Sequence, residues 1–523
     1  MLPWNMKRLY HLPLALILTL CFSLPVVTAQ SSVPENFEQW VTDGMEKWQI
    51  PGMAVSVVKN DEVIYSSGFG IKKLSSGEPV DEHTQFGIAS VSKNMTSATL
   101  GKLVDQGLIN WDDKVADIIP WFQLSDSYAT ANVTIHDLLT HQVGIGRMLG
   151  NRLQFMTHRS TEELLYRMRF HDFEQPFRSD YVYSNVMYTL AGYIVTEVTG
   201  MEWGEYLRNE FFNKMDMNRS NTSISDLDEE NAAWPHQYID GEVVEIPRRS
   251  WDNAAPAGGV NSTVCDMAQW MRMQLGEAGN WNGRSILSSE TIRDIQTPKI
   301  SLSSGTPVAP QRSYGYGFSI SDYNGTRLLS HGGATDGFNT IFMLVPEKNM
   351  GIIAVTNSFS SFQQAVAYTL LDHHLETEDG NDWNTLFWNN YQQVYERTKE
   401  ERNKFDDNRH ENSSASKELR NYTGLYHDDL YDNARVFLED GNLVLQFWND
   451  DTLVADLEHW HYDTFRINWR NPALREEFVT FRLGLNGYVN GMEVRYTLRP
   501  ALLQVGAYPT NYYRDVHFDK IAQ

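Results

Sequence analysis

The chain has 523 residues, 41% of them hydrophobic, and so exceeds the ~250–300 residues at which a single hydrophobic core stops growing. Charged residues make up 21%, and 43 Lys and Arg against 67 Asp and Glu give a formal net charge of −24. These values exclude a single small module and a disordered chain, and they argue against a nucleic-acid partner because an acidic chain repels phosphate backbones.

The first thirty residues have the pattern of a secretory signal peptide. Lys7 and Arg8 precede an apolar stretch from residue 12 to residue 27, and small residues before Ala29 suit cleavage there. The stretch is interrupted by two prolines and is shorter than the ~20 apolar residues of a membrane span, so no stable membrane anchor is expected. We therefore predict cleavage after Ala29 and a periplasmic or extracellular protein.

The next three hundred or so residues predict a sheet built from both ends of a domain, with a helical insertion between them. Alternating apolar residues and turn residues predict a hairpin over 51–70, with its turn at Asn60-Asp61, and strands at 314–320, 340–345 and 350–356. Apolar residues at helical spacing predict helices at 90–106, 161–168 and 186–198, and a further apolar helix after Phe362.

The last part of the chain changes to a period of two. A helix over 382–405 and a polar segment over 406–416, expected to be a flexible linker, precede hairpins at 435–447, around Asp440-Gly441, and at 478–496, with turns at Asn486-Gly487 and Asn490-Gly491. We predict a separate all-β domain, a sandwich or a small barrel. The expected division is signal peptide 1–29, main domain 30–380, helix and linker 381–417, and β domain 418–523.

The pattern Ser-x-x-Lys, in which a lysine amine can take a serine proton, occurs three times. Ser56 and Lys59 fall on a predicted strand, where residues three apart point to opposite faces. Ser414 and Lys417 fall in the polar linker, where nothing excludes water. Ser90 and Lys93 fall in the first turn of a predicted helix, where they share a face and the helix N-terminus favours an oxyanion. Only the copy at Ser90 is therefore expected to be catalytic.

Two further elements accompany this serine. Tyr183 and Asn185 form a Tyr-x-Asn before a predicted helix, where a buried phenol beside a lysine can share its proton; other copies, at Tyr431 and Tyr488, lie in the β-rich tail. His331-Gly332-Gly333 stands in a predicted strand, where glycines let a substrate backbone lie against the strand edge.

In this order the elements resemble the class C β-lactamase and penicillin-binding-protein-like serine hydrolases, a family that includes D-stereospecific peptidases and esterases. The resemblance covers about residues 35 to 360, and the tail resembles the lipocalin-like domain of some peptidases of this family. The segments that carry it are 50–55 (IPGMAV), 86–93 (FGIASVSK), 134–141 (TIHDLLTH), 257–263 (AGGVNST) and 330–333 (SHGG), with 421–426 (NYTGLY) and 457–462 (LEHWHY) in the tail.

The resemblance implies an α/β fold of the beta-lactamase/transpeptidase type, with an antiparallel sheet flanked by helices, a helical subdomain and a C-terminal all-β barrel. It implies that Ser90 is acylated, that Lys93 and Tyr183 are the general acid/base pair, and that Asn185 orients substrate. The backbone N–H groups of Ser90 and Ala334 would form the oxyanion hole.

The third motif departs from the Lys-Thr-Gly of the best-known β-lactamases and penicillin-binding proteins. His331 has an ordinary pKa of ~6.5 and provides no permanent positive charge for a substrate carboxylate. We therefore expect weak activity on β-lactams and D-Ala-D-Ala peptides. His459 and His461 share a strand face in the tail but lack a third ligand, so no metal site is predicted.

The sequence thus predicts a secreted serine hydrolase that cleaves small peptide, amide or ester substrates without a metal or organic cofactor. The open alternatives are a β-lactamase or D-Ala-D-Ala carboxypeptidase and, from another class, a catalytically silent ligand-binding sensor. Self-assembly into a homo-oligomer is also left open.

Overall fold

The computed structural model describes residues 31–146, 159–239, 241–276, 279–302, 309, 311–377, 380–474, 477–495 and 515–522. The expected signal peptide, residues 1–29, lies outside these residues. Apart from Ser31 and Ser32, the described residues belong to one compact unit, Val33–Gln523.

The main domain contains an eight-stranded antiparallel sheet assembled from both ends of the domain, as predicted. Its strand order is β2-β1-β14-β13-β12-β11-β10-β9, with bounds β1 Gly52–Lys59, β2 Glu62–Gly70, β9 Ile300–Ser301, β10 Arg312–Tyr314, β11 Ser319–Tyr323, β12 Thr326–Thr335, β13 Phe338–Val345 and β14 Met350–Thr356. Asn60 and Asp61 both have positive φ at the β1–β2 turn, the geometry of a type I′ hairpin. The predicted strand over 314–320 is wrong, because Gly315 to Phe318 form the turn between β10 and β11, where Gly317 has φ +79°.

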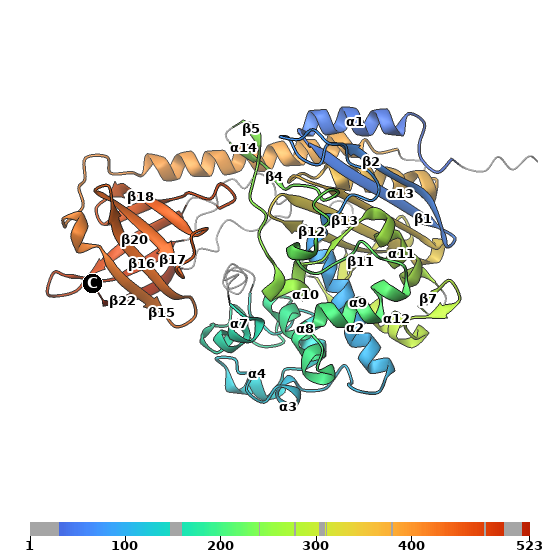
Figure 1. The fold of residues 1–523 in the computed structure, drawn as a ribbon, viewed down its shortest axis with the longest axis horizontal. Helices are drawn as coiled ribbons and strands as arrows, with labels where there is room; N and C mark the ends of the chain where they lie inside the picture. The colour runs from blue at the N-terminus through green and yellow to red at the C-terminus, as the bar shows by residue number, and fades with distance from the viewer. Residues whose placement is uncertain are drawn as a thin grey trace, which may run out of the picture. The chain divides into compact units, whose positions relative to one another are not determined.

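Helices cover both faces of this sheet. On one face Val55 and Val57 of β1 belong to a hydrophobic cluster with Phe362; on the other face Ala54 joins a cluster that includes Met95. The helices concerned are α1 (Phe37–Trp48), α13 (Phe362–Leu375) and α14 (Trp383–Asp407) on the first side, and α2 (Ser92–Asp105) and α11 (Val264–Leu275) on the second. Helix α1 lies beside α13 although the two come from opposite ends of the domain (Figure 1).

A helical subdomain lies between the two parts of the sheet in sequence, as predicted. Its helices are α3 Val115–Ile118, α4 Ser127–Asn132, α5 Ile135–Leu139, α7 Thr161–Arg167, α8 Asn185–Thr199, α9 Trp203–Glu210, α10 Ala255–Gly258 and α12 Ser289–Ile295. Three short ribbons accompany them: β3 Phe86–Gly87 with β6 Asn261–Ser262, β4 His236–Ile239 with β5 Glu242–Glu245, and β7 Asn280–Trp281 with β8 Arg284–Ser285. Thr134 and Asp137 form a reciprocal capping box at the start of α5, which fixes where this helix begins.

The predicted β domain is a closed eight-stranded barrel. Its strands are β15 Gly424–Asp428, β16 Asp432–Glu439, β17 Asn442–Phe447, β18 Val454–His461, β19 Thr464–Trp469, β20 Glu477–Leu483, β21 Val489–Arg495 and β22 Asp515–Ala522. Asp440-Gly441 and Asn486-Gly487 form turns as expected, whereas Asn490-Gly491 lies inside β21 and not at a turn. Of the two architectures predicted for this region, a sandwich or a small barrel, the structure has the barrel.

The polar segment before the barrel is not the free coil that its composition predicts. Helix α14 continues to Asp407, and beyond it Arg409 donates hydrogen bonds to the carbonyl oxygens of Trp460 (3.0 Å) and His459 (2.9 Å). Ser416 donates to the carboxylate of Asp463 at 2.8 Å. These bonds hold the segment against strand β18 and the turn that follows it, because its polar side chains find acceptors on the barrel.

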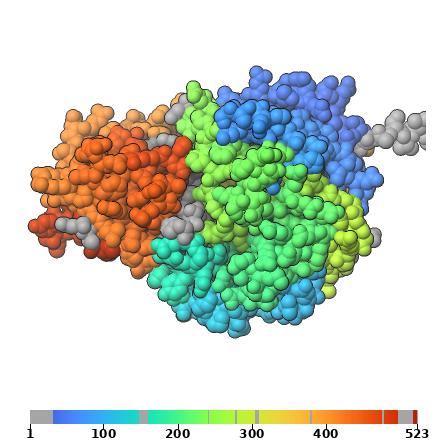
Figure 2. All heavy atoms as spheres, in the orientation of Figure 1, coloured from blue at the N-terminus to red at the C-terminus, as the bar shows by residue number. Residues whose placement is uncertain are grey.

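Segments that are far apart in the sequence lie next to each other on the surface of the main domain. Figure 2 shows blue N-terminal atoms and green atoms from the middle of the chain side by side on the face in view. Within the described residues, no helix combines the length and the apolar character needed to cross a membrane.

Candidate active site

Ser90 lies in the one-turn 3-10 helix η1 (Ala89–Val91), directly before α2. The residue before it, Ala89, has φ +50°, a left-handed conformation that costs a non-glycine residue of order 1–3 kcal/mol. Such a conformation persists only where its surroundings hold it. Here the Ser92 hydroxyl donates to the carbonyl oxygen of Ala89 at 2.7 Å and accepts from the backbone N–H of Val260 at 3.1 Å.

Lys93 is fully buried, and its Nζ atom lies within hydrogen-bonding distance of three neutral oxygen atoms. These are Ser90 Oγ at 3.1 Å, Asn185 Oδ1 at 2.7 Å and the carbonyl oxygen of Ala257 at 2.6 Å. An ammonium donates one N–H to each. A neutral amine keeps two N–H groups for Asn185 and Ala257, and its lone pair then points at Ser90 Oγ. The geometry therefore allows the serine proton to pass to Lys93.

The segment that contains Ala257 is fixed by side chains from the start of α2 and by the backbone N–H of Ile88, just before η1. Thr96 donates to the carbonyl oxygen of Pro256 at 2.7 Å, and Ile88 N–H donates to the carbonyl oxygen of Val260 at 3.0 Å. Together with Ser92, these bonds hold 256–260 along η1 and α2. The acceptor for Lys93 is thus a backbone atom placed by the motif that contains the serine.

Tyr183 and Asn185 come from the end of a loop and the start of α8. The half-buried Tyr183 ring lies with its centroid 4.9 Å from Lys93 Nζ, close enough for a cation–π contact when the lysine is charged. Asn185 is buried and uses its side-chain oxygen on Lys93. The two predicted motifs therefore meet at the lysine, and Asn185 holds the lysine in place.

His331 lies on β12 and is buried against Tyr314 of β10. Its Nδ1 lies 2.7 Å from the carbonyl oxygen of Gly332, which can only accept, so Nδ1 carries a proton. Its Nε2 lies 3.1 Å from the Tyr314 hydroxyl. Burial raises the pKa of Tyr314 well above its ordinary value, which keeps this hydroxyl protonated and able to donate to Nε2. A neutral imidazole with its proton on Nδ1 can make both of these contacts.

The two glycines after His331 differ in what they allow. A Cβ atom on Gly333 would lie 2.3 Å from the carbonyl oxygen of Ile88, so only glycine lets β12 approach the serine turn this closely. A Cβ atom on Gly332 would make only an ordinary contact, 3.9 Å from the carbonyl oxygen of Thr340. The β11–β12 pairing ends at Ser330, and Gly332 to Thr335 pair only with β13. The other edge of this half-strand, which includes Ala334, therefore faces the serine turn.

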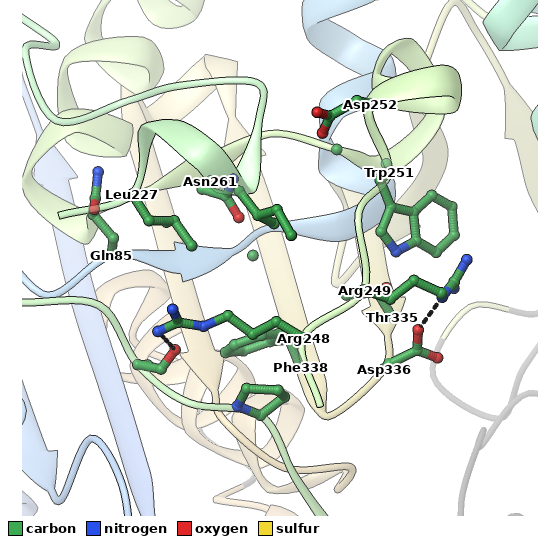
Figure 3. A pocket seen from close by; sticks show the side chains of 16 residues that line it. Gln85, Leu227, Arg248, Arg249, Trp251, Asp252, Asn261, Thr335, Asp336 and Phe338 are labelled. Carbon is green, nitrogen blue, oxygen red and sulfur yellow. Dashed lines mark hydrogen bonds and ion pairs between the residues drawn. The ribbon is translucent and has the colours of Figure 1, made fainter. Parts of the chain in front are cut away.

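A cavity of about 40 Å³ adjoins these elements (Figure 3). It is lined by Gly258, next to the Ala257 acceptor, by Thr335, next to Ala334, and by the side chains of Trp251, Arg249 and Asp336. Arg249 and Asp336 point toward each other and form an ion pair, and Trp251 packs on the Arg249 guanidinium (Figure 3). The pair neutralises both charges, so this part of the lining provides aromatic and apolar surface with little net charge.

The other copies of the motifs are not assembled in this way. Ser56 Oγ donates to the carbonyl oxygen of Tyr65, and Lys59 lies 3.5 Å from His374, so the strand separates this pair as predicted. Ser414 is exposed, and Tyr488 is 69% exposed. Tyr431 is buried, but it lies in the turn between β15 and β16 of the barrel, where its carbonyl oxygen accepts from Trp448 Nε1.

The barrel histidines lie on β18, where the strand pairing has an irregularity between His459 and His461. Within the described ranges no group of three or more His, Cys, Asp or Glu side chains is arranged to hold a metal ion.

Comparisons with known proteins identify the family of the main domain. A family model described as Beta-lactamase matches residues 37–376. The chain belongs to the Beta-lactamase family. A second model, described as Domain of unknown function (DUF3471), matches residues 408–511 and so covers most of the β domain.

Among the relatives in this family is Unguisins hydrolase ungD' of Aspergillus campestris (strain IBT 28561), which is 25% identical over 389 residues, or 71% of each chain. Protein flp of Staphylococcus aureus (strain NCTC 8325 / PS 47) is 24% identical over 339 residues, or 63% of this chain and 64% of that protein.

Among solved structures, the octameric penicillin-binding protein homologue from Pyrococcus abyssi is similar with a TM-score of 0.58 and 22% identity, covering 93% of this chain and 99% of that one. This likeness concerns the fold. The main domain thus has the beta-lactamase-like α/β fold of a family whose members are generally serine hydrolases, and the eight-stranded barrel is consistent with a lipocalin-like domain.

Sequence reasoning did not assign a role to three groups that contact the motif residues. The Ala257 carbonyl is a backbone atom and leaves no signal in residue identity. Tyr314, the partner of His331, lies in what the sequence presents as a strand. His141 stands in a segment quoted for the family resemblance, but nothing in one sequence shows what it contacts.

Proposed function

We propose that this protein is a serine hydrolase that cleaves amide or ester bonds through an acyl-enzyme on Ser90, most simply as a peptidase or esterase. The observation that carries the proposal is the lysine geometry. Two N–H groups of Lys93 are directed at the side-chain oxygen of Asn185 and the carbonyl oxygen of Ala257. The third tetrahedral direction of the nitrogen, an N–H in the ammonium or the lone pair in the neutral amine, then points at Ser90 Oγ. Burial disfavours an ammonium, which suits Lys93 to act as a base.

In the proposed first step the Ser90 hydroxyl proton passes to the Lys93 amine, and Oγ attacks the substrate carbonyl carbon. The carbonyl π electrons move onto oxygen, and the backbone N–H groups of Ser90 and Ala334 stabilise this oxyanion. The C–N or C–O bond then breaks as the leaving group takes a proton from the Lys93–Tyr183 pair. Water, deprotonated by the same pair, hydrolyses the acyl-enzyme in the reverse order of events.

The substrate class follows from His331 and the adjoining cavity. A neutral imidazole bonded to Tyr314 offers little attraction for a carboxylate, so we propose substrates that are uncharged at this side of the reacting bond. The small cavity next to Ala334, with Trp251, Leu227 and Phe338 in its lining, supports a compact, partly apolar substrate group there. Peptides with D-amino acids and small esters belong to this class.

Two further proposals concern the rest of the chain. The N-terminal sequence pattern supports export with cleavage after Ala29. For the barrel we propose a role in access to the cleft or in assembly, and not in the chemistry. A similar structure titled as octameric supports a test for a homo-oligomer by light scattering.

The test is a screen of the purified full chain with D-amino-acid peptides, nitrophenyl esters and nitrocefin, alongside Ser90→Ala. The proposal expects turnover of peptides or esters that Ser90→Ala lacks, and little turnover of nitrocefin. Nitrocefin as the best substrate would support a β-lactamase. Ligand binding without turnover of any substrate would support a sensor.

A further inference from the structure

The loop that carries Tyr183 contains no regular secondary structure between Asp172 and Ser184, the residue before α8. A phenol that exchanges protons with Lys93 must nevertheless be held within a fraction of an ångström, because misplacement by about 1 Å can cost about 10²-fold in rate. The loop therefore needs an external support at Tyr183.

His141 provides two hydrogen bonds to the residues on either side of Tyr183. It is fully buried, two residues after α5. Its carbonyl oxygen accepts from Val182 N–H at 2.8 Å, and its Nδ1 accepts from Ser184 N–H at 3.1 Å. Between these bonds the His141 ring lies on the Tyr183 ring, with centroids 4.4 Å apart and planes 39° apart.

These contacts require particular properties of residue 141. Because a backbone N–H can only donate, Nδ1 has no proton and the proton of the neutral ring is on Nε2. His141 also has φ +59°, a left-handed conformation that asparagine and histidine tolerate better than most residues. Residue 141 therefore needs a hydrogen-bond acceptor close to its own backbone, within reach of Ser184 N–H, and it must tolerate positive φ.

Other bonds between the same two segments act away from the tyrosine. Arg178 N–H donates to the carbonyl oxygen of Gln142 at 2.8 Å, and the Arg178 guanidinium donates to Asp137 at 2.6 and 2.8 Å. They fasten the middle of the loop. His141 alone among the described residues combines bonds to both neighbours of Tyr183 with a ring contact to Tyr183.

We propose that His141 is a positioning residue that sets the location of the Tyr183 hydroxyl relative to Lys93. This inference rests on the proposed function, in which Tyr183 takes part in proton transfer. His141 acts through Tyr183, so its effect on turnover must disappear when the Tyr183 hydroxyl is absent.

The experiment is a double-mutant cycle on the full chain, with the best ester or peptide from the screen. His141→Phe keeps a ring but removes the acceptor, and His141→Asn keeps an acceptor near Nδ1 and tolerates positive φ. Thr140→Val is the matched control, because buried Thr140 loses bonds to His136 and Gln142 without touching Tyr183. Each is measured alone and with Tyr183→Phe, together with its melting temperature.

We expect His141→Phe to lower kcat by about 10²-fold with KM nearly unchanged, and His141→Asn to recover most of that loss. Thr140→Val should lower the melting temperature but leave kcat close to that of the wild type. In the Tyr183→Phe background, His141→Phe should reduce kcat by less than about twofold, because residues that act as a unit are not additive.

An equal loss from His141→Phe in both backgrounds, or no recovery by His141→Asn, would overturn the proposal. If His141→Phe does not fold, His141→Gln replaces it, since its longer side chain places the acceptor beyond the Nδ1 position. Turnover retained by Ser90→Ala would overturn the proposed function itself. An inactive Ser90→Ala with additive losses at His141 would overturn only the role of His141.

Discussion

The serine turn of the main domain and the tail around the barrel contain the same short patterns but differ in surroundings. At the serine turn, Lys93 is fully buried and meets three oxygen acceptors. In the tail, Ser414 is exposed and Tyr488 projects from a turn with 69% of its surface exposed. The comparison teaches that Ser-x-x-Lys and Tyr-x-Asn become a candidate site only where serine, lysine and tyrosine meet in one buried cluster with fixed acceptors, as they do around Lys93.

The largest expected difference between the two regions is at the serines. Ser90→Ala should reduce turnover by about 10³-fold or more, because the covalent step has no other nucleophile, while Ser414→Ala should match the wild type. Initial rates on one ester, with circular dichroism to verify folding, measure both. A Ser90→Ala enzyme that still turns over would break the distinction between the regions.

The lysines provide the next contrast. Lys93→Ala and Tyr183→Phe should each lose about 10²- to 10³-fold in kcat, and the double variant should be little worse than either single one, because the pair acts as a unit. Lys417→Ala and Tyr488→Phe are the matched controls and should be neutral. Multiplicative losses in the double variant would show that Lys93 and Tyr183 act separately.

Helical spacing predicted that Ser90 and Lys93 share a face, and the structure places Lys93 Nζ 3.1 Å from Ser90 Oγ. That Tyr183 and Asn185 join this pair was implied by the family resemblance and not by local spacing. Periodicity predicted a sheet with a helical insertion and a separate all-β domain, but it left a sandwich and a barrel both open. The sequence could not predict that residues 315–318 form a turn, because aromatic residues with alternating glycines resemble a strand. It missed the Ala257 carbonyl and the His141 bonds, since backbone acceptors and contacts between distant segments leave no local pattern.

A smaller effect is expected at His331, the first residue of the His-Gly-Gly motif. His331→Lys should improve kcat/KM for carboxylate-bearing substrates relative to neutral esters by about tenfold, the size expected for one hydrogen bond to a charged group. His331→Gln, which stays neutral, should not change this ratio. Efficient nitrocefin hydrolysis by the wild type would contradict the reasoning and favour a β-lactamase.

The smallest effect is expected from removing the barrel. We expect a chain that ends at Asp407 to keep turnover of a small nitrophenyl ester. The truncated chain also carries Phe405→Ser, because removal of Trp460 and Phe478 would leave the Phe405 ring without its contacts and exposed to solvent. Its preference for peptide length or its mass in light scattering should change. A folded, monodisperse truncation that has lost ester hydrolysis would mean that the barrel contributes directly to the catalytic site.

The most direct measurement of the central claim is fluorophosphonate labelling of the full chain, followed by peptide mapping and by labelling rates for the wild type, Lys93→Ala and Lys417→Ala. We predict a single adduct on Ser90 that forms at the same rate in the wild type and Lys417→Ala, and about 10²-fold more slowly in Lys93→Ala. An unlabelled Ser90, or an adduct that forms equally fast without Lys93, would contradict the account.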